Sequence, residues 1–339
     1  MIDFVISVDY EIYGSGEGSL MGLAFEPAEK LRELFREWNA RFVVFPEVAE
    51  IEMIEANGAD VAIKPVLEQL RGFYQEGHEI GLHIHPWWYS ARYEDGRWNI
   101  DRTEYNLCAL PLERITRIID RAIAYTRRLA GAVDFRPISF RAGHLLFQPT
   151  QPLADVLFMR GIRLDSSVYR GGLWPDHQLD YRSAPGNLYY WKFRQDAARP
   201  EKQGNLFEVP IFTRQAPVWK LLTSKRIALQ QKGISAGQAR NRFIKRLSNL
   251  RHIHYPLKFD LGQMTKAEIV RMIETIFEED RSDPSMYRPV VSIIHTKDPI
   301  DFDAVRNLLK VSSERGVRIS TFAGVYHKIR ETSDWYEEK

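Results

Sequence analysis

The stretch FVISVDYE, residues 4–11, is a short apolar run that ends in two acids. Its β-branched residues predict a buried strand over residues 4–8. Asp9 and Glu11 follow that strand, and residues two apart on an extended chain point to the same side. Both carboxylates can therefore face one site at the carboxyl end of the strand.

Strand-like and helical patterns alternate along the rest of the chain. Strand-like runs occupy residues 41–48, 78–85, 137–143, 162–168, 206–212, 289–295 and 317–324, and helical patterns occupy residues 27–38, 65–77, 112–130, 152–161, 266–277 and 302–316. Such alternation favours a parallel sheet. We predict an α/β fold that closes as a (β/α) barrel of seven or eight parallel strands, and a doubly wound open sheet is the alternative.

One segment departs from this alternation. Between Val209 and Phe259 the sequence has eleven basic residues and no acidic residue. We find no internal repeat and no low-complexity linker beside it, so the segment is interpreted as an excursion from one domain. The prediction is a single domain over residues 1–339 that includes a basic insertion at residues 213–259.

Composition narrows the class of protein. A hydrophobic content of 44% and a charged content of 27% over 339 residues are typical of a folded globular chain, and a net charge of +2 gives no overall reason to expect a nucleic-acid partner. Cys108 is the only cysteine, so an internal disulfide is excluded. The N-terminus lacks the basic segment of a signal peptide, and no apolar stretch approaches the roughly 20 residues that span a bilayer. We expect a soluble, cytoplasmic protein without a transmembrane segment, and the sequence does not determine its oligomeric state.

Several predicted strands end in polar side chains that can bind metal or carry protons. His83 and His85 lie two apart at the end of one strand, so both imidazoles can share a face. Two imidazoles and a carboxylate are typical of a zinc site, and cobalt, nickel and iron are alternatives. The remaining polar residues at strand ends are Arg141, His144, Asp165 and His295. Each alone is more often structural, but their convergence at the carboxyl ends of parallel strands predicts a functional site.

The strings SVDYE, GHEIGLHIHPWW, SFRAGH, LDSSV and IIHTKD occur in this order along the chain. In that order they resemble the polysaccharide deacetylase superfamily, carbohydrate esterase family 4, also called NodB-like deacetylases. The resemblance covers most of the chain but excludes the basic insertion. It implies a distorted (β/α) barrel and a metal-dependent deacetylase activity.

The resemblance also implies a role for each matching residue. Asp9 corresponds to the catalytic base, and Glu11 to a metal ligand that is usually an aspartate. His83 matches the first of two histidines four residues apart, but the second position is Trp87 here. His85 is therefore the expected second histidine ligand, and His144 is the alternative.

The remaining matches imply which residues transfer a proton and which residues orient or tune those groups. Arg141 would orient the catalytic carboxylate and keep it charged. His295 would be the acid that protonates the leaving amine, and Asp165 would tune that histidine.

The expected substrate is an N-acylated sugar, most simply an N-acetylated one, and it can contain phosphate because the insertion is basic. Trp87, Trp88 and His144 are expected to contact it. We place the reaction in bacterial surface-glycan biosynthesis, for example of O-antigen. One alternative is hydrolysis of another amide or imide, such as a cyclic ureide, on the same fold. A second is a non-catalytic, sugar-binding protein that has lost the metal.

Overall fold

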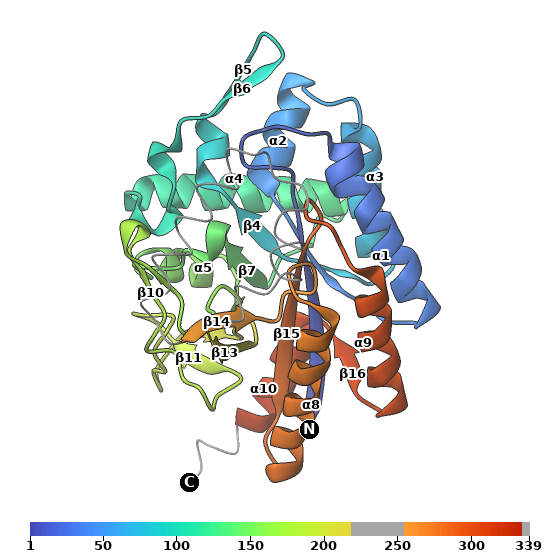
Figure 1. The fold of residues 1–339 in the computed structure, drawn as a ribbon. Coiled ribbons are helices and arrows are strands. Elements are labelled where there is room, and N and C mark those ends of the chain that lie inside the picture. Colours follow the sequence, from blue (N-terminus) through green and yellow to red (C-terminus); the bar gives the residue numbers. More distant parts are fainter. Residues whose placement is uncertain (218–253, 334–339) are drawn as a thin grey trace.

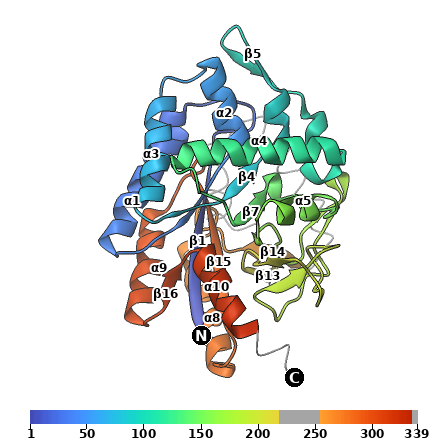
Figure 2. The same cartoon turned by 180° about the vertical axis from the view of Figure 1, so that it is seen from behind.

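The computed structural model describes residues 1–217 and 254–333. It is a mixed α/β fold built around two five-stranded sheets. The first sheet has the order β15-β1-β2-β3, with β16 also paired to β1, and the second has the order β11-β12-β8-β7-β4. The principal helices lie outside the strands, with α1, α3 and α9 along one side and α4 crossing behind β4 and β7 (Figures 1 and 2).

The strands of the two sheets are β1 (Ile2–Tyr10), β2 (Val43–Pro46), β3 (Glu79–Ile80), β4 (Leu82–Ile84), β7 (Ser139–Ala142), β8 (Leu164–Asp165), β11 (Trp191–Phe193), β12 (Leu206–Glu208), β15 (Arg288–His295) and β16 (Arg318–Ser320). The remaining strands form short antiparallel pairs: β5 (Arg92–Glu94) with β6 (Arg97–Asn99), β9 (Leu173–Trp174) with β10 (Leu179–Asp180), and β13 (Thr213–Pro217) with β14 (His254–Lys258). The α-helices are α1 (Glu26–Glu37), α2 (Val48–Asn57), α3 (Ile63–Gln75), α4 (Leu112–Ala130), α5 (Leu153–Met159), α8 (Lys266–Ser282), α9 (Phe302–Glu314) and α10 (Phe322–Ser333).

Strand β1 is the centre of the first sheet. It runs parallel to β15 along one edge and to β2 and β16 along the other, and Asp9 lies in register with His295 and with Phe45. Alternate residues of the strand belong to different cores: Val5 packs in the smaller apolar cluster, whereas Phe4 packs in the larger one. Asp9, four residues after Val5, therefore points to the same side as Val5.

Isolated parallel bridges connect the two sheets at two places. Glu47, which follows β2, bridges to His83 in β4. Ile211, which follows β12, bridges to Val291 in β15. The carboxyl end of β2 in the first sheet is therefore tied directly to the strand of the second sheet that carries the histidine motif.

The predicted alternation is confirmed as a mixed α/β fold whose two main sheets are parallel except for the antiparallel pair of β11 and β12, and α4 has the bounds that its apolar spacing predicts. Its apolar residues face the core, and Gly131 ends the helix with a φ of 66°. Helices α2 and α10 were not predicted. Helix α2 follows β2 at once, because the side chain of Glu47 accepts the amide of Glu50 and caps the helix.

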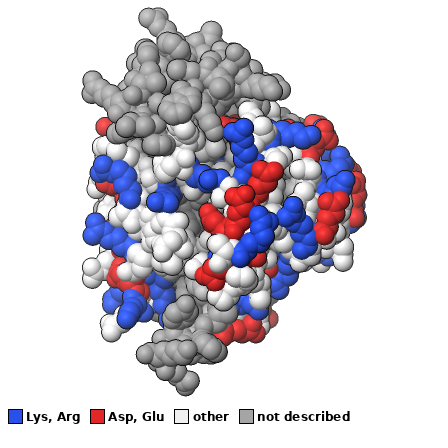
Figure 3. All heavy atoms as spheres, turned by 60° about the horizontal axis from the view of Figure 1, so that its bottom comes forward, with Lys and Arg blue, Asp and Glu red and all other residues white. Residues whose placement is uncertain are grey.

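The described ends of the basic insertion, β13 and β14, pair antiparallel and form a ribbon that leaves the main sheets. The rest of the insertion, residues 218–253, lies outside the described residues. Within residues 1–217 and 254–333, no helix is both long and apolar enough to cross a membrane. On the face in Figure 3, basic and acidic side chains of the described residues are interleaved rather than gathered into one patch of a single sign.

Candidate functional site

The carboxyl end of β1 brings together two of the predicted catalytic residues. Arg141 Nη1 donates to Asp9 Oδ1 at 2.6 Å, and the side chains are 0% and 3% exposed. Burial by itself would raise the pKa of Asp9, but Arg141, with smaller effects of His83 and His295, lowers that pKa below its usual value. Asp9 is therefore held as a carboxylate inside the protein.

Arg141 is held by contacts beyond Asp9. Its Nε donates to the carbonyl of Ser166 at 3.0 Å, and its Nη2 donates to the hydroxyl of Ser7 at 2.9 Å. The guanidinium carbon lies 4.4 Å from the centre of the Phe45 ring. Because these partners fix the guanidinium on several sides, its orientation towards Asp9 is set before any substrate arrives.

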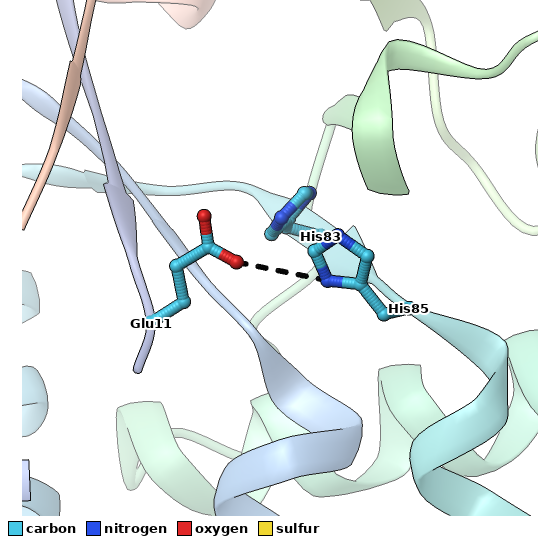
Figure 4. A group of neighbouring side chains, drawn as sticks. All are labelled: Glu11, His83 and His85. Carbon is cyan, nitrogen blue, oxygen red and sulfur yellow. Dashed lines mark ion pairs between the residues drawn. The ribbon is translucent and has the colours of Figure 1, made fainter. Parts of the chain in front are cut away.

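Glu11, His83 and His85 form a group whose potential ligand atoms all lie within 4.8 Å of one another. Figure 4 shows the three side chains pointing towards one another, Glu11 from the end of β1 and the histidines from β4 and the residue after it. Glu11 Oε2 lies 3.7 Å from His85 Nδ1, and both side chains are 5% exposed. The donor set of two imidazoles and a carboxylate is the one that zinc prefers.

The orientation of His83 suits metal binding. Its Nδ1 lies 2.9 Å from the carbonyl oxygen of Arg141, which can only accept a hydrogen bond, so in the neutral ring the lone pair is on Nε2. That Nε2 is buried and has no hydrogen-bond partner among the described residues. A buried nitrogen without a partner is costly, and a metal ion held with Glu11 and His85 would satisfy it.

A second group, Asp9, Glu11 and His295, also has potential ligand atoms within 4.8 Å of one another. Its carboxylates already have cationic partners, because Arg141 binds Asp9 and Lys297 Nζ lies 2.8 Å from Glu11 Oε1. Glu11 and its partner Lys297 are common to both groups, so the cation that specifically opposes a metal ion at the second group is Arg141, through its pair with Asp9. His295 Nε2 lies 3.5 Å from Asp9 Oδ2, so the predicted acid and base are neighbours.

His144 lies near the histidine motif but outside both groups. It has a φ of 53°, and its ring stacks on Tyr105 with the ring centres 4.7 Å apart and contacts the ring of His85 at the same separation. Among the described residues, His85 rather than His144 is therefore placed with Glu11 and His83. The ligand role of each histidine stays a prediction.

Asp165 takes part in a different network from the one predicted. Its carboxylate accepts the amide and hydroxyl of Ser167, and in the described structure it makes no hydrogen bond or ion pair with His295. Burial raises the pKa of Asp165 to about 6 and that of the neighbouring Glu208 well above its usual value. The prediction that Asp165 tunes His295 therefore has no direct contact to support it.

The two tryptophans expected at the substrate are buried. Trp87 is 1% exposed and Trp88 is 0% exposed. Trp87 packs on the ring of His85, with the ring centres 4.6 Å apart, and Trp88 packs edge-on against Trp98. Neither indole offers an open face to a sugar ring in this structure, so their stacking on substrate stays a prediction that the structure does not support.

Two functional contacts were missed from the sequence. Lys297 binds Glu11 and is placed two residues after His295. Glu47, at the carboxyl end of the second predicted strand, accepts the amide of His85 at 2.7 Å. The alternation rule that singled out Asp9 and Glu11 would have found Lys297, and the position of an acid at a strand end would have drawn attention to Glu47.

No protein-family model matches the sequence, and neither does any curated protein. Among solved structures, a candidate polysaccharide deacetylase from Mycobacterium smegmatis matches with a TM-score of 0.54 and 14% identity, over 98% of this chain and 91% of that chain. A second candidate polysaccharide deacetylase, from Pseudomonas aeruginosa, matches with a TM-score of 0.47 and 16% identity, over 95% of this chain and 88% of that chain. The allantoinase PuuE matches with a TM-score of 0.47 and 12% identity, over 94% and 87%. The last two structures have TM-scores below 0.5, so the fold assignment rests on the first. The protein therefore shares its fold with the Mycobacterium smegmatis structure, and the resemblance inferred from its motifs is confirmed at the level of the fold.

Proposed function

We propose that the protein is a metal-dependent hydrolase that removes an N-acyl group, specifically acetyl, from a sugar. The observation that carries the proposal is the grouping of Glu11, His83 and His85 beside the buried ion pair of Asp9 and Arg141. The deacetylase fold supports it. The amide bond of an N-acetyl sugar needs an activated water, an electrophile for the carbonyl oxygen and an acid for the leaving amine.

Glu11, His83 and His85 would hold the metal. Zinc is the ion we expect, with cobalt, nickel and iron as alternatives, because imidazole and carboxylate ligands suit all four. A divalent ion supplies an electrophile for the carbonyl oxygen and makes water more acidic. The free, buried Nε2 of His83 is the feature of the chain that best fits such an ion.

Asp9, kept ionised by Arg141, would accept a proton from the water that adds to the carbonyl carbon. His295, 3.5 Å from Asp9, would donate a proton to the amide nitrogen as the carbon–nitrogen bond breaks. The products are a carboxylic acid, acetate for an acetyl group, and the free amine of the sugar. Each chemical role then falls to a different side chain.

We further propose that the sugar is a cytoplasmic intermediate of bacterial surface-polysaccharide assembly, such as O-antigen, linked to a nucleotide, a lipid phosphate or a growing glycan. The motif resemblance and the basic insertion support this proposal. Arginine and lysine pair favourably with phosphate oxygens, so an insertion with eleven basic residues suits a phosphate-bearing substrate.

We also propose that the whole chain is a single domain and that the two sheets close into a distorted (β/α) barrel. The parallel bridges from Glu47 to His83 and from Ile211 to Val291 support closure, because they connect the two sheets at two separate places. A barrel of this kind would place the carboxyl ends of its parallel strands around one mouth.

Acetate release by the zinc-loaded protein tests the proposed function. N-acetylated nucleotide sugars and glycan oligomers should yield acetate. His83→Ala should lose both bound metal and activity, whereas the matched control His144→Ala should keep the metal. Asp9→Asn should keep the metal and lose about 100-fold or more in kcat, since general-base catalysis is worth about that much. Absence of acetate from every sugar, or turnover confined to cyclic ureides, would contradict the proposal.

A further inference from the structure

Two acids at the start of α2, Glu47 and Glu50, are buried and take no part in the proposed chemistry. They are 0% and 1% exposed. A buried carboxylate is tolerated only where hydrogen bonds replace its hydration. Both of these carboxylates accept main-chain amides from the segments that carry Glu11, His83 and His85. Their hydrogen bonds thus lead directly to the proposed metal site.

Glu47 contacts both segments at once. Its amide donates to the carbonyl of Tyr10 at 2.9 Å, next to Glu11. Its main chain bridges to His83 in the parallel sense, and its Oε1 accepts the amide of His85 at 2.7 Å. Glu47 therefore lies in the main-chain connection between the end of β1 and the end of β4.

Glu50 completes the connection on the other side. Its Oε1 accepts the amide of Ile12, the residue after Glu11, at 2.9 Å. Its own amide donates to Glu47 Oε2. A continuous path of hydrogen bonds therefore runs from Ile12 through Glu50 and Glu47 to His85.

We propose that Glu47 and Glu50 are positioning residues of the metal site, which hold Glu11 and His85 at the separation that a metal ion requires. This inference rests on the proposed metal site. Glu11 follows a strand of the first sheet and His85 follows a strand of the second. Removing the Glu47 carboxylate would leave the buried amide of His85 without its acceptor, and the ligand would no longer be fixed relative to Glu11.

Helix capping alone is the competing explanation, because the Glu47 side chain also caps α2. Loss of a cap lowers stability but leaves metal affinity unchanged. Thr265 offers a matched control, since it caps α8 through a capping box and lies outside the site. Thr265→Ala should lower the unfolding midpoint and leave zinc affinity as in wild type.

The test measures the zinc dissociation constant by competition with a chelator, together with the unfolding midpoint of the metal-free protein. Glu47→Ala and Glu50→Ala should bind zinc about 10- to 100-fold more weakly, the usual effect of removing a group that orients a ligand. Glu47→Gln should bind zinc more tightly than Glu47→Ala, because its carbonyl oxygen can still accept the His85 amide, but more weakly than wild type, because its NH2 group cannot accept the Glu50 amide.

Wild-type affinity in both alanine variants would overturn the inference and leave the proposed function standing. If Glu47→Ala fails to fold, Glu50→Ala decides the matter, because wild-type zinc affinity in Glu50→Ala contradicts the proposed path. Zinc binding without acetate release from any sugar would instead remove the proposed activity and leave the positioning role intact. A wild-type protein that binds no zinc would remove both.

Discussion

Arg141 places a full positive charge in the interior, 0% exposed, where it would be strongly destabilising without partners. Asp9 balances the charge, and the oxygens of Ser7 and Ser166 take up further donors of the guanidinium. The same contacts that make the charge tolerable also fix Asp9 as a carboxylate. Stability and the proposed chemistry therefore depend on the same hydrogen bonds.

The buried carboxyl group of Asp165 should make stability depend on pH. Burial raises its pKa to about 6, above the usual value of 3.8, so between these values the folded protein retains a proton that the unfolded chain has released. Its stabilising contribution is fully present below about pH 4 and is lost as pH rises through about 6. Asp165→Asn removes this titration, so its free energy of unfolding should rise relative to that of wild type as the pH is raised from 4 to 7.

Urea unfolding of both proteins at several pH values measures this difference. Asp176→Asn, at an exposed aspartate, is the control and should follow wild type at every pH. The prediction fails if the difference in free energy of unfolding between Asp165→Asn and wild type stays constant from pH 4 to pH 7, or changes in favour of wild type. Either result would show that the buried carboxyl is ionised throughout.

At the scale of the element, Gly81 lets the histidine strand fit. It separates β3 from β4, and a Cβ there would lie 2.6 Å from one carbon of the Phe45 ring and 2.8 Å from Ser139 Oγ. The Phe45 ring supports the guanidinium of Arg141. We predict that Gly81→Ala costs about 1–3 kcal/mol in the free energy of unfolding, as overpacking usually does.

Urea unfolding followed by circular dichroism measures this cost. Gly22→Ala is the matched control, because the nearest atom to its added Cβ would be Ser19 Oγ at 3.5 Å. The control should be neutral or slightly stabilising. Equal effects of the two substitutions would mean that β4 has room to move, and that the backbone around His83 is less constrained than the contacts indicate.

Helices whose apolar residues repeat at regular helical spacing could be predicted, and helices with polar residues among the buried ones could not. α4 was found because its apolar residues repeat at helical spacing over 19 residues. α2 was missed because its buried residues include an acid, Glu50, whose partner Ile12 lies 38 positions away. For the site, the spacing of two residues along one strand predicted that the carboxylates of Asp9 and Glu11 lie near each other. The position of Asp165 relative to His295 depends on the packing of separate strands, which no local pattern encodes.

At the scale of the whole molecule, the site lies where the two sheets meet. Glu11 and His295 belong to the first sheet, or directly follow it, and His83 belongs to the second. The bridge from Glu47 to His83 joins the sheets at this point. The ribbon of β13 and β14 pairs only within itself in the sheet order of the described residues, so the insertion it carries can be removed without breaking either sheet.

Deletion of residues 218–253 tests the part that the insertion plays in substrate binding. Pro217 and His254 are paired at the end of the ribbon, so an Asn-Gly turn can join them. The deletion removes nine basic residues and no acidic ones, which changes the net charge from +2 to −7. Zinc affinity should be unchanged, because the proposed ligands lie in or directly after β1 and β4. Acetate release from a phosphate-bearing sugar should fall about 10-fold relative to the same sugar without phosphate, the loss of one charge-assisted contact.

The ratio of kcat/KM for the two sugars, measured at low and high salt, gives the outcome. In wild type the preference for the phosphate-bearing sugar should weaken as salt is added, and in the deletion variant it should be small at every salt concentration. A second variant keeps the segment but replaces Arg240, Arg242, Lys245 and Arg246 with glutamine, which separates charge from fold if the deletion variant is unstable. An equal loss of activity on both sugars would assign the insertion to something other than phosphate recognition.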